Sequence, residues 1–193
     1  NPWHEGDVGI TNGRIENVGQ LGKSKAKRRI NAKGLMISPG FIDMHTHSEI
    51  SVLAIPTVDS KVMQGVTTEV CGNCGFSVAP LKAETAEFIR SQRGPHGFPD
   101  FEWGWLSVDE YLNTVEKTRT SVNITLYLGH GAIRASVMKF ADRAPTTGEL
   151  EEMKHLVESG MKDGAFGIST GLRYVPGAYA DTKEVVELSK IVA

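Results

Sequence analysis

Hydrophobic and polar positions follow one pattern up to about residue 40 and another pattern after it. Before this point, short alternating segments predict β-strands. Asn12-Gly13, between two such segments, is the strongest short signal for a β-hairpin. We expect four short strands in this block, at residues 7–10, 14–18, 29–31 and 35–37. Residues 1–40 are therefore expected to form part of a small β-domain.

After residue 40, short apolar segments alternate with stretches of helical pattern, which is typical of parallel strands joined by helices. We expect strands at 41–47, 67–71, 122–128 and 165–170, and helices at 59–64, 107–119, 146–162 and 181–193. Two helices begin with capping boxes, Ser107 with Glu110 and Thr146 with Glu149. The Gly-, Pro- and aromatic-rich segment 82–105 breaks the alternation and is expected to be a long loop or lid.

The composition excludes some classes of function but does not indicate a particular one. The 193 residues are 40% hydrophobic and 23% charged with a net charge of −2, which is typical of a globular protein and offers no field for nucleic acid. No apolar run is long enough to predict a membrane span. The basic run Lys23–Arg29 is best interpreted as a solvated loop, rather than as a localisation signal or an anion-binding patch. Two cysteines do not suggest a disulfide scaffold and favour a cytoplasmic location.

The first candidate site lies at the end of the predicted strand 41–47. Residues two apart in a strand share a face, so Asp43, His45 and His47 are expected on the same side. Two imidazoles where an apolar strand ends could converge on one metal ion, although single histidines are more often structural. Histidines without this context are expected in surface or loop roles: His4, His96 and His155.

The second candidate is the Cys71-Gly-Asn-Cys74 motif, which fits either a redox pair or part of a zinc site. A redox motif should open a helix, because the helix N-terminus lowers the thiol pKa. The following segment, Gly75–Pro80, is a poor helix start. One thiolate as a metal ligand therefore fits better, with Cys74 as the ligand beyond the strand and Cys71 as a buried residue.

Six motifs, in order and with natural spacing, resemble the N-acyl-D-amino-acid deacylases (D-aminoacylases) of the metal-dependent amidohydrolase superfamily. They are Pro39-Gly-Phe-Ile-Asp-Met-His-Thr-His47, Gln64-Gly-Val-Thr-Thr68, Gly72-Asn-Cys-Gly75, Ala79-Pro-Leu81, Gly129-His-Gly-Ala-Ile-Arg134 and Gly164-Ala-Phe-Gly-Ile-Ser-Thr-Gly-Leu-Arg-Tyr174. The His-x-His pair is shared across the superfamily, whereas the Gly-Asn-Cys-Gly and Ser-Thr-Gly-Leu-x-Tyr motifs are much narrower signals. The resemblance covers essentially the whole chain.

This resemblance implies an α/β fold, namely a TIM-like (β/α)8 barrel with a small β-sandwich. Residues 41–193 would supply its first four β/α units, and residues 1–40 would supply part of the sandwich. It also implies a site for one or two zinc ions, in which His45 and His47 hold one position and Cys74 serves the other, tighter one. Three further residues are expected near the substrate: Tyr174, Arg173 and His130.

The resemblance further implies a zinc-dependent hydrolase that cleaves the amide bond of small N-acyl-D-amino acids by metal-activated water. The proton-transferring Asp and two more histidine ligands of the family are expected beyond residue 193. We therefore expect this chain to be the N-terminal part of an enzyme and assign no catalytic residue within it. The alternatives are a cyclic amide or small peptide as substrate, a non-catalytic fragment with a structural zinc, and a thiol–disulfide oxidoreductase using both cysteines.

Overall fold

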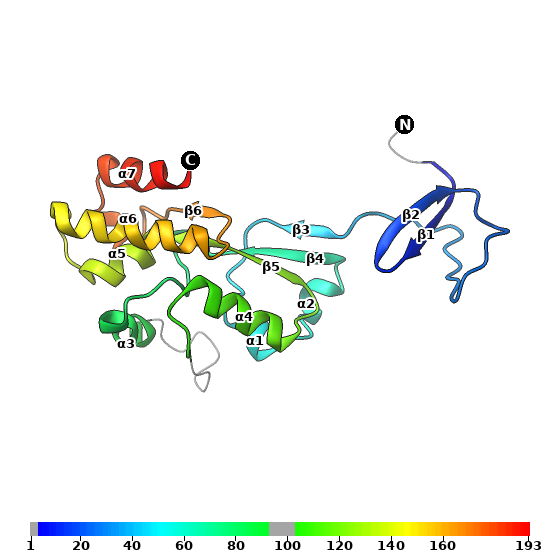
Figure 1. Ribbon diagram of the computed structural model, residues 1–193, viewed down its shortest axis with the longest axis horizontal. Helices are drawn as coiled ribbons and strands as arrows, with labels where there is room; N and C mark the ends of the chain where they lie inside the picture. Colours follow the sequence, from blue (N-terminus) through cyan, green and yellow to red (C-terminus); the bar gives the residue numbers. More distant parts are fainter. Residues whose placement is uncertain (1–3, 93–102) are drawn as a thin grey trace. The chain divides into compact units, whose positions relative to one another are not determined.

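A two-stranded antiparallel hairpin and a four-stranded parallel sheet form the framework of the chain (Figure 1). The computed structural model describes residues 4–92 and 103–193. The chain divides into two compact units, Asn1–Pro39 and Gly40–Ala193, which are described separately. Within the described residues, no helix combines the length and the apolar character needed to cross a bilayer.

The hairpin lies in the first unit and confirms the prediction from the Asn-Gly pair. Strand β1 (Asp7–Thr11) pairs with β2 (Arg14–Gly19). Asn12 and Gly13 have φ angles of 51° and 75°, as a tight two-residue hairpin turn requires. The strands predicted at 29–31 and 35–37 were wrong: these residues form no strand, and their large apolar side chains are exposed. A short apolar run becomes a strand only where a neighbouring strand accepts its backbone hydrogen bonds.

The parallel sheet lies in the second unit and has the strand order β3-β4-β5-β6, which is also the order along the chain. Its strands are β3 (Phe41–Asp43), β4 (Val66–Cys71), β5 (Asn123–Gly129) and β6 (Gly167–Ser169). All three pairings are parallel. The carboxyl ends of neighbouring strands therefore lie at one edge of the sheet, which is where ligands bind in such sheets.

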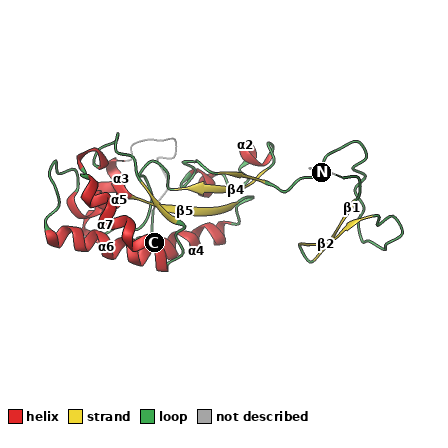
Figure 2. Ribbon diagram, turned by 90° about the horizontal axis from the view of Figure 1, so that it is seen from above, coloured by secondary structure: helices red, strands yellow, loops and turns green. Residues whose placement is uncertain are grey.

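Helices follow each strand of this sheet (Figure 2). They are α1 (Ser51–Ala54), α2 (Asp59–Val62), α3 (Ala83–Gln92), α4 (Val108–Thr118), α5 (His130–Met138), α6 (Thr147–Lys162) and α7 (Thr182–Val192), with a 3-10 turn at Gly177–Tyr179. Both predicted capping boxes are present, at the starts of α4 and α6. The observed sheet and helices confirm the α/β class, while the complete barrel and the β-sandwich stay predictions.

The core joins the sheet to the helices that cover it. Leu126 and Leu128 of β5 are fully buried, and they share a core cluster with Tyr111 of α4 and with Met153 and Val157 of α6. Burial of each such side chain stabilises the fold by about 1.5–3 kcal/mol relative to exposure. Strand β5 continues directly into α5, so the same contacts also fix the position at which α5 begins.

Two local predictions need correction, and one helix was missed. The first strand ends at Asp43, earlier than expected, because the Asp43 carboxylate accepts the N–H of His45 (3.2 Å) and bends the chain. The segment predicted as a loop at 82–105 contains α3, whose Ala86 and Ile89 are buried in a cluster with Ala135 of α5. The remainder of that segment, 93–102, lies outside the described residues. Helix α5 itself was not predicted, because a Gly-His-Gly sequence gives no start signal.

Candidate metal centre

His45 and His47 extend from the carboxyl end of β3 on the same side of the chain. Although the strand ends at Asp43, the alternation continues through residue 47. Thr46 is buried on the opposite side, where its N–H donates to Val70 O (3.1 Å) and its hydroxyl lies 3.2 Å from Cys71 Sγ. His45 and His47 remain exposed, with ring centroids 5.6 Å apart. The prediction that His45 and His47 share one side is therefore confirmed, although the strand ends before them.

Cys74 lies in a tight turn that follows β4. Its φ is +56°, which is unfavourable for a non-glycine residue, and Gly72 and Gly75 on either side also have positive φ. A side chain at Gly72 would clash with the main-chain oxygen of Tyr127, so the turn packs directly on β5. Strain of this kind at a potential ligand is typical of functional sites.

Two polar side chains hold this turn in shape. Asn73 donates through Nδ2 to Val70 O (2.7 Å). Ser169, at the end of β6, donates to Gly72 O (2.5 Å) and accepts the N–H of Gly75 (3.0 Å). The Ser169 hydroxyl therefore closes the turn from a strand 97 residues later in the sequence.

The three predicted ligands converge. His45 Nε2 lies 3.1 Å from Cys74 Sγ, and one ligand atom from each of His45, His47 and Cys74 lies within 4.8 Å of the others. Two such donors on a single tetrahedral zinc would be about 3.3–3.6 Å apart, given typical zinc–nitrogen and zinc–sulfur bond lengths. A thiolate with two imidazoles also favours zinc over magnesium or calcium. The chemistry of these side chains therefore fits a zinc ion, and their donor atoms lie near the spacing that such an ion requires.

Asp43 shares the strand but not the cluster. Its Oδ2 accepts a hydrogen bond from Lys61 Nζ (2.6 Å), and its Oδ1 accepts the N–H of His45. The hydrogen bond from Lys61, followed by that from His45, lowers the pKa of Asp43. Oδ1 thus holds the backbone from which His45 projects, and Oδ2 is engaged by Lys61.

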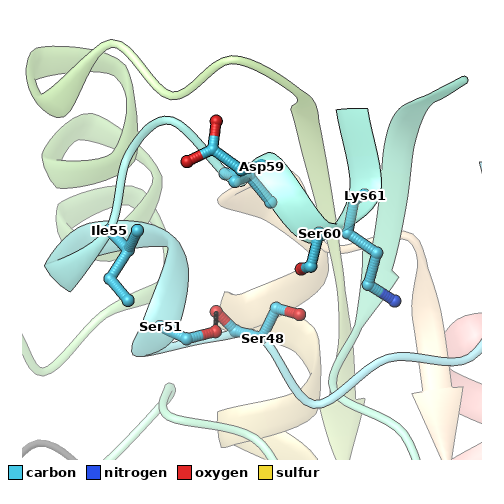
Figure 3. A pocket seen from close by; sticks show the side chains of 7 residues that line it. Ser48, Ser51, Ile55, Asp59, Ser60 and Lys61 are labelled. Carbon is cyan, nitrogen blue, oxygen red and sulfur yellow. Dashed lines mark hydrogen bonds between the residues drawn. The ribbon is translucent and has the colours of Figure 1, made fainter. Parts of the chain in front are cut away.

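A hollow beside Lys61 is lined mainly by polar side chains of the α1–α2 region (Figure 3). The Ser51 hydroxyl donates to Ser48 O (3.2 Å), and the side chains of Ser60 and Lys61 form the adjacent wall. None of the three clustered ligands lines this hollow.

The two cysteines have different environments. Cys71 is fully buried, and burial raises the pKa of its thiol to about 12. Cys74 is partly exposed and faces His45, and neither cysteine is in a disulfide. This asymmetry argues against a redox pair, which needs an accessible thiolate of low pKa.

The predicted substrate residues lie at different distances from the cluster. The Tyr174 ring is 5.3 Å from the Phe76 ring, which in turn is 6.3 Å from the His47 ring, so Tyr174 lies one aromatic ring away. Arg173 is exposed beside it. His130, in contrast, is buried, and its Nε2 lies 2.8 Å from Glu184 Oε1. The structure does not bring His130 into the ligand cluster, and its predicted substrate contact stays a prediction.

Sequence reasoning missed Glu49, Ser169 and the buried group around Glu184. Ser169 and Asn73 stood within quoted motifs, but nothing local indicated which backbone groups they contact. Glu49 follows His47 by two residues, and its side chain is 5% exposed. The sequence shows that Glu49 is close to His47, but only the structure shows that its carboxylate is buried there.

Comparison with known proteins places these residues in a family. The sequence profile of the amidohydrolase family matches residues 28–189. A D-aminoacylase of Alcaligenes xylosoxydans xylosoxydans is 37% identical over 98% of this chain and 38% of its own length.

Two solved structures are also similar to this chain. One is a D-aminoacylase with a binuclear metal center, 38% identical with a TM-score of 0.83, which matches 96% of this chain and 38% of that one. The other is the N-acyl-D-glutamate deacylase of Bordetella bronchiseptica in complex with zinc and a phosphonate inhibitor, a mimic of the reaction tetrahedral intermediate. It is 31% identical with a TM-score of 0.83 over 96% of this chain and 38% of that one. This chain thus spans well under half the length of the proteins that it matches. Because the profile match covers most of its residues, the chain belongs to the amidohydrolase family.

Proposed function

We propose that this chain forms part of the metal site of a zinc-dependent hydrolase that cleaves the amide bond of N-acyl-D-amino acids. The observation that carries the proposal is the convergence of His45, His47 and Cys74 at the carboxyl ends of β3 and β4. Similarity to D-aminoacylases over nearly the whole chain supports the substrate class. An eight-stranded barrel that continues the observed order of parallel strands is part of the same proposal.

In this proposal, His45, His47 and Cys74 hold one or two zinc ions. Bound there, zinc would lower the pKa of water to about 7 and polarise the carbonyl of the scissile amide. The residues of the chain supply the positions: Asp43 fixes the backbone at His45, and Ser169 and Asn73 fix the turn that carries Cys74. We do not assign the proton transfer to the leaving amine to any residue of this chain.

Substrate contacts are proposed for the segment after β6. Tyr174 and Phe76 form an aromatic surface next to His47, suited to the apolar part of an acylated amino acid. Arg173 is exposed beside Tyr174, where a guanidinium could pair with a carboxylate of the substrate. The Bordetella relative acts on N-acyl-D-glutamate, which has an acidic side chain.

The reaction is tested with the purified native gene product and N-acetyl-D-methionine, with the L enantiomer as the control substrate. We expect release of D-methionine only, and loss of this activity in Cys74→Ser but not in the matched variant Cys71→Ser. Metal binding without hydrolysis of any N-acyl-D-amino acid would instead indicate a structural zinc. Turnover confined to cyclic amides or small peptides would reject the proposed substrate class.

Arg173 is tested separately. Arg173→Ala should lower kcat/KM for N-acetyl-D-glutamate more than for N-acetyl-D-methionine, because only the former has a second carboxylate to pair with the guanidinium. An unchanged preference between the two substrates would rule out recognition of an acidic side chain by Arg173.

A further inference from the structure

Glu49 lies between the two segments that carry the proposed ligands. It follows His47 by two residues and is buried, whereas His45 and His47 are exposed. Its main-chain oxygen accepts a hydrogen bond from the Tyr111 hydroxyl of α4 (3.0 Å). Burial raises the pKa of Tyr111 well above its usual value, so the phenol stays protonated and remains a donor. The backbone at Glu49 is thereby fixed to the core of the second unit.

The Glu49 side chain reaches the turn that carries Cys74. Its Oε1 accepts the N–H of Gly72 at 2.8 Å, within the buried interior. Gly72 is the first residue of that turn and packs against Tyr127, so a shift at Gly72 would move Cys74 as well. Ser169 holds the next peptide group of the turn, through Gly72 O.

The same oxygen also faces a proposed ligand. Glu49 Oε1 lies 3.9 Å from His47 Nδ1, which is too long for a hydrogen bond but close enough for a direct electrostatic contact. A negative charge beside Nδ1 favours the tautomer that carries its proton there, and Nε2 is then left as the metal-binding nitrogen.

We propose that Glu49 is a positioning residue that fixes His47 and the Cys74 turn relative to each other through one carboxylate oxygen. This inference rests on the metal site of the proposed function. Asp43 cannot substitute for Glu49, because both of its oxygens are engaged by Lys61 and by the backbone of His45. Glu49 is thus the carboxylate, among the described residues, that contacts both ligand-bearing segments.

The test is a titration of the metal-free protein with Co²⁺, a spectroscopic substitute for zinc whose thiolate absorption reports binding at Cys74. Glu49→Gln keeps the size of the side chain and an acceptor for Gly72 N–H but removes the charge that faces His47. We expect a Kd for Co²⁺ that is up to roughly 10-fold higher, at the lower end of the range for hydrogen-bonded partners of metal-ligating histidines, because the contact with His47 is longer than a hydrogen bond. The matched control is Glu69→Gln, because Glu69 is also fully buried and has no hydrogen-bond partner among the described residues. It should leave the Kd unchanged.

A second measurement does not depend on any variant. Nitrogen-15 NMR of the histidine rings in the metal-loaded protein should show His47 protonated at Nδ1 and coordinated through Nε2. Coordination through Nδ1, or an unchanged Kd in a folded Glu49→Gln protein, would overturn the inference while leaving the metal site intact. Failure of the unsubstituted protein to bind Co²⁺ would overturn the metal site and the inference together.

Discussion

Replacement of Glu184 by glutamine is expected to lower the free energy of unfolding by about 3 kcal/mol near neutral pH. Glu184 lies in the first turn of α7 and is 1% exposed. One carboxylate oxygen lies 2.8 Å from His130 Nε2, and the other accepts a hydrogen bond from the guanidinium of Arg134. Both partners belong to α5, so this buried group joins two helices through residues that are 50 and 54 positions apart in sequence.

The magnitude follows from what the substitution leaves behind. Arg134 is fully buried, and without the carboxylate its positive charge has no counter-charge in direct contact among residues 4–92 and 103–193. Breaking a buried pair from one side typically costs 3–5 kcal/mol. Arg134 still donates to the main-chain oxygens of Ala141 and Arg143, at 3.3 and 2.5 Å, which places the expected loss at the lower end of that range.

The loss should also depend on pH. Burial by itself raises the pKa of Glu184, but hydrogen bonds from His130 and Arg134 outweigh it, so the pKa lies below the usual 4.5. A lowered carboxylate pKa contributes stability that is present above the unfolded-state pKa and is lost as pH falls through the folded value. The difference between the two proteins should therefore be constant near neutral pH and shrink below 4.5.

The assay is urea unfolding monitored by tryptophan fluorescence, with the m-value checked for two-state behaviour. Glu187→Gln is the control, since this residue lies one turn further along α7 and pairs with Lys190 and Lys154 near the surface. It should change the stability far less, because solvent screens its pairs. A loss in Glu184→Gln below about 1 kcal/mol, the range of exposed ion pairs, would refute the reasoning.

Further predictions concern the turn, the core and a helix start. In the native protein, a thiol reagent at mildly alkaline pH should label Cys74 but not Cys71, because burial raises the pKa of Cys71 to about 12; equal labelling would contradict this. Gly129→Ala should destabilise by about 1–3 kcal/mol or more, since its Cβ would lie 2.5 Å from the main-chain carbon of Phe76. Gly148→Ala, in open space within α6, should instead stabilise by up to about 1 kcal/mol, with both glycine variants measured by urea unfolding. Ser107→Ala should cost about 1 kcal/mol through loss of the α4 cap, as measured by urea unfolding.

Features that depend on neighbouring residues were predictable from the sequence. The hairpin turn at Asn12-Gly13, the caps at Ser107 and Thr146 and the apolar strands β4 and β5 all follow from conformational preferences within a few residues. The same is true of the shared side of His45 and His47, because their spacing of two sets it. Predictions failed where the outcome depends on a distant partner. Residues 29–31 and 35–37 pair with no strand in the part of the chain that the structure describes, and α3 forms where Ala86 and Ile89 can be buried against α5.

The sequence by itself therefore determined the α/β class, the family resemblance and the identity of three candidate ligands. Only the tertiary structure decided how they meet. Parallel register between β3 and β4 brings Cys74 to 3.1 Å from His45 across 29 residues of sequence, and Ser169 reaches Gly72 across 97. Glu49 likewise contacts both ligand-bearing segments only after the sheet has formed. Such contacts arise from strand register and core packing, which depend on the whole chain and leave no local pattern in the sequence.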